Sequence, residues 1–249
     1  MEVKLAIFVC DSCIPSIEQV EGNYENIFRT FLTKANNEFE TPHKLIIDAF
    51  DVYKYEYPED VTVYDGIIIS GSNSDAFSEL DWIIDLVDFI RGLTYSFPKV
   101  SVIGICFGHQ IIARSLGGAV DRGNMKEFGS TVVDVVNKDL AKNYFGFDNQ
   151  FRIFEAHRDV VTKKPASLTN VASTPQCPYQ AFIKFNGEKV HIWSVQGHPE
   201  FTESIMTKIA ESDILAEEPS DEVKNAWLDK SKEEHDGIAL GKAILKLFI

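Results

Sequence analysis

Short, unbroken apolar segments alternate with longer segments of helical spacing along the first 116 residues. Unbroken apolar segments are typical of strands buried on both faces. Four such strands are predicted, over Val3–Val9, Lys44–Phe50, Asp65–Ser70 and Val100–Ile105. Apolar residues recur every three or four positions over Glu25–Phe39 and Leu80–Leu93, which predicts amphipathic helices. This order predicts an α/β fold with a mostly parallel central sheet and helices on both faces.

A different pattern follows Gly117-Gly118, because short β-rich segments now succeed one another with turns between them. Strands are predicted over Thr131–Val136, Gln150–Phe154, Gln180–Phe185 and Val190–Val195, as antiparallel additions to the sheet. A helix is predicted over 201–213, and a helical segment over about 221–249 with a break near Asp236-Gly237. No stretch rich in Pro, Gly or Ser divides the chain, so we expect a single domain over 1–249 with the C-terminal segment packed on it.

Composition narrows the range of partners. Hydrophobic residues make up 45% of the 249 residues, enough for a sizeable core. The net charge of −14 argues against nucleic acid and against an anionic membrane surface as partners. The sequence shows neither a signal-peptide pattern nor an apolar run of about 20 residues, so the cytoplasm (cytosol) is the expected location.

A turn of small residues joins the fourth predicted strand to a helix, in the segment Gly104-Ile105-Cys106-Phe107-Gly108-His109-Gln110. Gly104 and Gly108 remove side chains where strand and helix crowd each other. One thiol stands at the tip, as a serine does in the nucleophile elbow G-x-S-x-G. Because a helix N-terminus favours the thiolate, Cys106 is the candidate nucleophile.

A second motif supplies a base for that thiol. The predicted strand Val190–Val195 runs into Gln196-Gly197-His198-Pro199-Glu200, and Pro199 biases His198 towards extended backbone. A carboxylate two residues away can hold one imidazole nitrogen and leave the other free for a thiol. This is the nucleophile, base and orienting-residue logic of a catalytic triad.

Together, G-x-C-x-G-H-Q and, about ninety residues later, Q-G-H-P-E resemble the motifs of the triad-type (class I) glutamine amidotransferases, with a similarity that extends over roughly residues 3–205. The chain is also similar to small stand-alone fungal and plant members, some of which are γ-glutamyl peptidases. The resemblance implies a flavodoxin-like fold with antiparallel additions. It also implies Cys106 as nucleophile, His198 as base and Glu200 as the residue that orients His198.

Acyl transfer also needs an oxyanion hole. One donor is expected to be the backbone N–H of Phe107, directly after the nucleophile. The family places a glycine-rich loop after the third strand, where this chain has Ser70-Gly71-Ser72-Asn73-Ser74-Asp75. Gly71 and Ser72 are therefore predicted to form the second wall, although an ordinary strand-to-helix turn would have the same composition.

Substrate contacts are predicted at Gln110, His157, Asp159 and Asp75. The resemblance implies that Gln110 contacts bound glutamine. It further implies that Ala156-His157-Arg158-Asp159 matches a pocket-lining S-H-x-D segment, with Ala156 in place of the usual hydroxyl residue. Charge complementarity makes Asp75 and Arg158 candidates for the two ends of an amino-acid substrate. His109 is expected to be structural, because it points away from the thiol.

Neither a metal site nor a cofactor is predicted. Cys10 and Cys13 are spaced C-x-x-C, but no second cysteine pair supports zinc, and two free thiols are the expected state.

The predicted activity is hydrolysis of a γ-glutamyl amide, glutamine or a γ-glutamyl peptide, through a thioester on Cys106. Two catalytic interpretations are open: a glutaminase subunit with a synthetase partner, or a stand-alone γ-glutamyl peptidase acting on glutathione or its conjugates. A catalytically silent binding protein is less favoured, because no substitution at the triad supports it. A relative of the chaperone and deglycase type is less favoured, because Phe107 stands where those relatives place a histidine.

Overall fold

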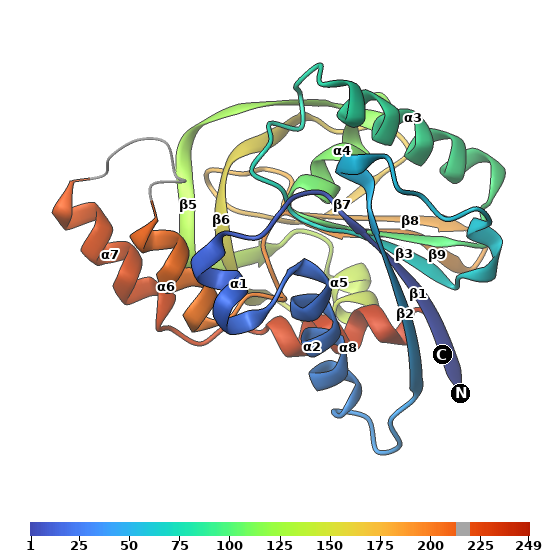
Figure 1. The fold of residues 1–249 in the computed structure, drawn as a ribbon, viewed down its shortest axis with the longest axis horizontal. Helices are drawn as coiled ribbons and strands as arrows, with labels where there is room; N and C mark the ends of the chain where they lie inside the picture. The colour runs from blue at the N-terminus through green and yellow to red at the C-terminus, as the bar shows by residue number, and fades with distance from the viewer. Residues whose placement is uncertain (213–219) are drawn as a thin grey trace.

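The computed structural model describes residues 1–212 and 220–249, and within them one nine-stranded sheet runs through the molecule in the order β2-β1-β3-β4-β9-β8-β7-β5-β6 (Figure 1). The strands are β1 (Glu2–Val9), β2 (Lys44–Asp51), β3 (Gly66–Ile69), β4 (Ser101–Ile105), β5 (Ala119–Val135), β6 (Gln150–Lys163), β7 (Thr169–Ser173), β8 (Ala181–Asn186) and β9 (Lys189–Val195).

The α-helices of the described residues are α1 (Pro15–Glu21), α2 (Tyr24–Asn36), α3 (Asp81–Ser96), α4 (Phe107–Ser115), α5 (Lys138–Tyr144), α6 (Glu203–Glu211), α7 (Asp221–Ser231) and α8 (Gly237–Lys246). Two short 3₁₀ turns lie at Val52–Lys54 and Val61–Val63. The break predicted near Asp236-Gly237 separates α7 from α8. Residue 213, the last of the helix predicted over 201–213, lies outside the described residues.

Parallel pairing joins β2, β1, β3, β4 and β9. The four strands predicted in the first 105 residues all belong to this half, which confirms the α/β assignment. The prediction that Val190–Val195 is an antiparallel addition was wrong on one side, because β9 pairs parallel with β4 and antiparallel with β8. The carboxyl ends of β4 and β9 therefore meet at one edge of the sheet, where open α/β sheets place their ligands.

The other half, β8-β7-β5-β6, is antiparallel, so the sheet is mixed. β5 and β6 extend well beyond the predicted Thr131–Val136 and Gln150–Phe154. Most residues over Ala119–Lys126 are exposed, so no alternation of apolar residues marks that part of β5. An irregularity between Arg122 and Glu127 also interrupts the pairing with β6.

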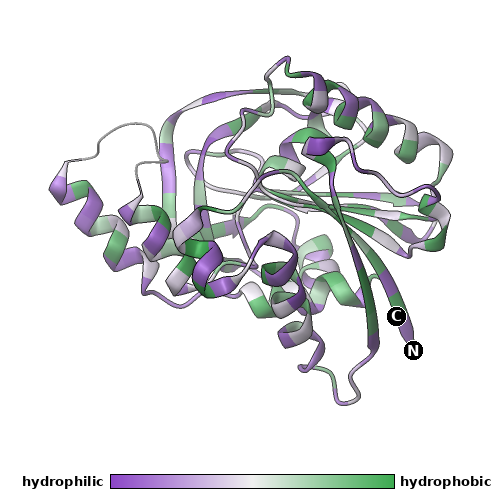
Figure 2. Ribbon diagram, in the orientation of Figure 1, coloured by the Kyte–Doolittle hydropathy of each residue, from purple (hydrophilic) through white to green (hydrophobic). Residues whose placement is uncertain are grey.

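Helices cover both faces of the sheet, as predicted. One face packs α2 and α8 onto β1 through side chains such as Phe28, Leu32 and Ile244. The other packs α3 and α4 through Leu86, Ile90 and others. Figure 2 shows the inner strands as largely hydrophobic and the helices as carrying both polar and apolar residues. A third apolar cluster links α1, α6 and α7.

Candidate active site

The turn between β4 and α4 holds Cys106 in a conformation that side chains rarely adopt. Its φ is 52° and its ψ is −106°, and Tyr55 is the other non-glycine residue of the described chain with positive φ. The backbone is crowded here, since a Cβ on Gly104 would lie 2.7 Å from the Gly108 carbonyl carbon. The strained turn lifts the thiol above the carboxyl edge of the sheet.

Cys106 is the N-cap residue of α4 and is buried. Its backbone N–H donates to the Val195 carbonyl at 3.0 Å, which ties the turn to the end of β9. The side-chain amide of Gln196 donates to Cys106 Sγ at 3.7 Å. The sulfur therefore lies at the positive end of the helix dipole, with an amide donor beside it.

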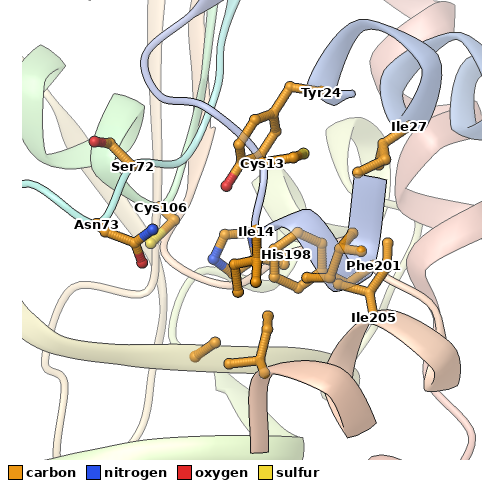
Figure 3. A pocket seen from close by; sticks show the side chains of 13 residues that line it. Cys13, Ile14, Tyr24, Ile27, Ser72, Asn73, Cys106, His198, Phe201 and Ile205 are labelled. Atoms are coloured by element: carbon orange, nitrogen blue, oxygen red, sulfur yellow. The ribbon is translucent and has the colours of Figure 1, made fainter. Parts of the chain in front are cut away.

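His198 lies just after β9 and faces the same thiol. Its Nδ1 is 2.9 Å from Glu200 Oε1, and its backbone N–H donates to the Phe154 carbonyl at 2.7 Å. The ring stacks on Phe201 with centroids 3.9 Å apart. These contacts hold the imidazole on three sides, and Figure 3 shows a ring nitrogen turned towards Cys106. We name the three predicted catalytic residues, Cys106, His198 and Glu200, the catalytic cluster.

The pKa of His198 reflects two opposing effects. Burial alone would lower it, but the neighbouring Cys106 sulfur and the Glu200 carboxylate, each also a hydrogen-bond partner, raise it to about 10. A buried imidazole with this pKa carries a proton at neutral pH. It can therefore form an ion pair with a thiolate and deliver that proton to a leaving group.

Gly71 brings the glycine-rich loop against the side chains of Cys106 and His198. A Cβ added at Gly71 would lie 2.8 Å from His198 Cε1 and 3.8 Å from Cys106 Cβ, so a larger residue would displace the imidazole ring. Within the described chain, the backbone N–H groups of Gly71, Ser72 and Phe107 have no protein acceptor. Ser72 turns its hydroxyl to Asp11 Oδ2 at 3.3 Å, so only its backbone is available as a donor.

Gln110 lies behind Cys106, the predicted nucleophile. It is buried, and its side-chain amide donates to the Asp159 carbonyl at 2.8 Å and to Gln196 Oε1 at 3.1 Å. Gln196 in turn contacts the Cys106 sulfur. Gln110 therefore reaches the thiol indirectly, through the side chain of Gln196. Sequence reasoning did not single out Gln196, although it is the first residue of the Q-G-H-P-E motif.

His157 lies in a second buried group of charges, which we name the buried charge cluster: Glu127, Glu155 and His157. Its Nε2 is 3.1 Å from Glu127 Oε2 and 3.2 Å from Glu155 Oε2, and its Nδ1 is 3.0 Å from the Asp159 carbonyl. Burial alone would lower the pKa of His157, but the hydrogen bonds to both carboxylates raise it well above its usual value. Both ring nitrogens are therefore occupied by protein groups.

Asp75 and Asp159 meet through a shared arginine. Arg122 contacts Asp75 Oδ1 and Asp159 Oδ1, each at 2.6 Å. Burial, with Asp75 nearby, raises the pKa of Asp159 to about 6 despite the opposing effect of Arg122. The pairing of Asp75 with Arg122 was not predicted, since sequence reasoning considered Arg158, whose Nε donates to the Gly123 carbonyl.

A pocket of about 50 Å³, partly open to solvent, adjoins the catalytic cluster (Figure 3). Cys106, His198, Ser72 and Asn73 form one end of it. The rest is largely apolar and comes from the segments around α1, α2 and α6: Cys13, Ile14, Ile17, Tyr24, Ile27, Ala156, Phe201, Ile205 and Ile209. Sequence reasoning missed this wall because its residues lie far apart in the chain.

The remaining candidate groups are not part of the catalytic cluster, although Cys13 lines the pocket beside it. His109 contacts the Ser194 hydroxyl and the Tyr179 carbonyl, and burial lowers its pKa to about 3, so it is a neutral structural residue. Cys10, Cys13 and Cys177 are free thiols, and burial raises the pKa of each. In residues 1–212 and 220–249, no group of three or more metal-binding side chains comes together, and no helix is long and apolar enough to cross a membrane.

Comparison with known proteins gives a consistent result. The family model described as glutamine amidotransferase class-I matches residues 43–215. Gamma-glutamyl peptidase 2 of Arabidopsis thaliana is 34% identical over 200 residues, which cover 78% of this chain and 76% of the plant protein. A glutamine-hydrolyzing GMP synthase subunit from Sulfolobus acidocaldarius is 32% identical over 142 residues, covering 57% of this chain and 70% of that protein.

A solved structure has the same fold over nearly the whole chain. The crystal structure of a glutamine amidotransferase from Thermotoga maritima superposes with a TM-score of 0.73 at 21% identity. The match covers 99% of this chain and 98% of the bacterial one.

Proposed function

The chain belongs to the class I glutamine amidotransferase family, and from this premise we propose that it hydrolyses a γ-glutamyl amide through a γ-glutamyl thioester on Cys106. The observation that carries the proposal is the catalytic cluster: a strained thiol at a helix N-terminus beside an imidazole held by Glu200. A cysteine, a histidine and a carboxylate in this order of contact supply the nucleophile, the base and the orienting group of acyl transfer.

In the first step the Cys106 thiolate attacks the γ-carbonyl carbon, and the carbonyl π electrons move to oxygen. The N–H groups of Phe107 and of the Gly71-Ser72 wall stabilise this oxyanion, because none of them is engaged by a protein acceptor within the described chain. The His198 imidazolium then gives its proton to the leaving nitrogen, and the carbon–nitrogen bond breaks. A γ-glutamyl thioester and a free amine or ammonia result.

In the second step neutral His198 accepts a proton from water, and the hydroxide attacks the thioester carbon. The carbon–sulfur bond breaks, glutamate leaves, and the thiolate–imidazolium pair is restored. Glu200 keeps Nδ1 of His198 protonated throughout, so the other nitrogen performs both proton transfers.

We assign the amino-acid end of the substrate to Asp75, Arg122 and Asp159, which offer two carboxylates for an ammonium and one guanidinium for a carboxylate. Gln110 and His157 are proposed to support the site without touching substrate. Gln110 positions Gln196, and both ring nitrogens of His157 are already occupied.

Two forms of the activity have support. The 34% identity to a plant gamma-glutamyl peptidase favours a stand-alone hydrolase of γ-glutamyl peptides such as glutathione or its conjugates. The similarity to a GMP synthase component favours a glutaminase that passes ammonia to a synthetase partner. The apolar lining of the pocket beside Cys106 favours the first, because ammonia has no apolar surface to place against it.

The test is glutamate release by the purified chain from glutamine and from glutathione. Release from glutathione with little from glutamine would support the peptidase, and release from glutamine would support the amidotransferase subunit. Cys106→Ala is the control for both. If neither substrate releases glutamate and Cys106 is alkylated only slowly, the proposal is overturned in favour of a catalytically silent binding protein.

A further inference from the structure

The pocket beside the catalytic cluster has a chemistry that does not suit the γ-glutamyl end of a substrate. That end carries an ammonium and a carboxylate, whereas the far wall of the pocket is made of apolar side chains, with Ile17, Ile27 and Ile205 buried. None of Asp75, Arg122 and Asp159 lines it. The apolar wall therefore fits the other side of the scissile bond, where the leaving amine lies.

Tyr24 places a polar group in this otherwise apolar wall. It is the first residue of α2, and the reciprocal hydrogen bonds between Asn23 and Asn26 fix the backbone at that end. Among the residues described, nothing hydrogen-bonds to the Tyr24 hydroxyl, and Figure 3 shows this hydroxyl projecting into the pocket towards the space between Cys106 and His198.

The Tyr24 hydroxyl is a donor at any pH of interest. Burial raises its pKa well above the usual value, and the nearby Cys13, Asp11, Glu200 and Cys106 act in the same direction. The same surroundings place its oxygen within electrostatic reach of both Glu200 and Cys106. Tyr24 is half-buried and lines the pocket, so its hydroxyl is open to an acceptor atom of a bound molecule.

Asn73 lies across the pocket from Tyr24. Its backbone N–H donates to Asp11 Oδ2 at 2.8 Å, which holds the loop, while its side-chain amide has no partner in the described part of the chain. Figure 3 shows that amide beside Cys106. Two unpaired polar groups thus face each other above the thiol, with an apolar surface behind them.

We propose that this pocket binds the residue on the amine side of the γ-glutamyl bond, with an apolar side chain against Ile14, Ile27 and Ile205 and with the Tyr24 hydroxyl donating to its carbonyl or carboxylate oxygen. The preferred substrates are then γ-glutamyl peptides whose second residue is apolar. Tyr24 is the specificity-determining residue, and Asn73 holds the same backbone from the opposite side. The inference rests on the proposed function.

The first experiment compares γ-glutamyl-leucine with γ-glutamyl-aspartate on the wild-type chain. Burial of a leucine side chain predicts a preference of at least about 10-fold in kcat/KM for the leucine peptide. Ile14→Gln should reduce that preference. Cleavage of both peptides at equal rates, or of glutamine alone, would overturn the inference and leave the proposed function intact. Cleavage of no γ-glutamyl compound would instead overturn the proposed function.

The second experiment uses Tyr24→Phe, which keeps the ring and removes the donor. Loss of one hydrogen bond predicts a fall of about 5-fold in kcat/KM for γ-glutamyl-leucine, carried mainly by KM. Glutamine and γ-glutamyl methylamide should be unaffected, because their leaving groups have no oxygen. The matched control is Tyr57→Phe, whose buried hydroxyl also lacks a partner in the described residues but packs beside Phe8 and Phe89. Equal losses on all substrates would contradict a specificity role for Tyr24.

Discussion

The catalytic cluster and the buried charge cluster each hold a buried histidine beside carboxylates, yet only one of them faces the pocket. His198 uses Nδ1 for Glu200 and has its other nitrogen available to Cys106. His157 has Nε2 on Glu127 and Glu155 and Nδ1 on the Asp159 carbonyl. The pKa of each histidine is raised. A shifted pKa therefore does not distinguish a base from a structural cation, whereas the number of free ring nitrogens does.

The two clusters also lie on different halves of the sheet. His198 follows β9, which is the last strand of the parallel half, and so it reaches the carboxyl edge where β4 ends. Glu127, Glu155 and His157 come from β5 and β6 in the antiparallel half. Parallel strands collect reactive loops at one edge, while antiparallel strands here bury charge and hold the loops in place.

Replacement of Cys106 should give the largest difference between the two clusters. Cys106→Ala is expected to lower kcat/KM by about 10³-fold or more, since Cys106 is the thiol that contacts His198. Loss of the sulfur should also lower the pKa of His198, measurable by NMR titration of the imidazole, and lower that of His157 by less, because Cys106 is the smallest of the causes there. Cys177→Ala, at a buried thiol outside the pocket, is the control. Retained turnover in Cys106→Ala would reject the mechanism.

Replacement of the structural histidine should act on stability. His157→Gln leaves a buried carboxylate without a cation, which is expected to cost about 3–5 kcal/mol of unfolding free energy. Because the pKa of His157 is raised on folding, its stabilisation is complete below the unfolded value of about 6.5 and is lost as pH rises through the folded value. Denaturant unfolding of wild type and variant at several pH values measures this.

His235→Gln provides the comparison for that measurement. Burial lowers the pKa of His235 to about 4, so the residue is neutral and holds no buried anion. Its substitution should cost much less unfolding free energy. Equal costs for the two variants would mean that the charge of His157 contributes nothing beyond packing.

Removal of charge from the catalytic cluster should have an intermediate effect on the rate. Glu200→Gln keeps a hydrogen-bonding group for His198 but removes the negative charge, so kcat is expected to fall about 10- to 100-fold. Steady-state kinetics with γ-glutamyl peptides measure the loss. Glu203→Gln, at the first turn of α6, is the control for loss of a nearby carboxylate. A complete loss in Glu200→Gln would indicate a role beyond orientation.

The smallest effect is expected in the pH profile of the wild type. His198 must carry a proton to expel the amine, and its pKa is about 10, so kcat/KM should decline only above about pH 10. In Glu200→Gln the decline should begin at lower pH, because one cause of the raised pKa is gone. A decline of the wild-type rate already between pH 7 and 8 would show that His198 does not carry this proton.

Much of the parallel half could be predicted because its signals are local. The apolar runs at Val3–Val9 and Val100–Ile105 and the glycines around Cys106 each specify a short segment, and the structure contains them. The antiparallel half was less predictable. The exposed start of β5 has no apolar alternation, and the five residues of β7 are too few to give a period.

By itself the sequence determined the strained elbow at Cys106, the extended turn that carries His198 and Glu200, and the alternation of strands and helices, because each depends on neighbouring residues. Only the tertiary structure decided that β9 lies parallel beside β4, which brings together two side chains 92 positions apart. It also decided that Arg122 joins Asp75 to Asp159 and that Tyr24 reaches the thiol pocket. Burial and charge partners arise from long-range packing, which no local pattern records.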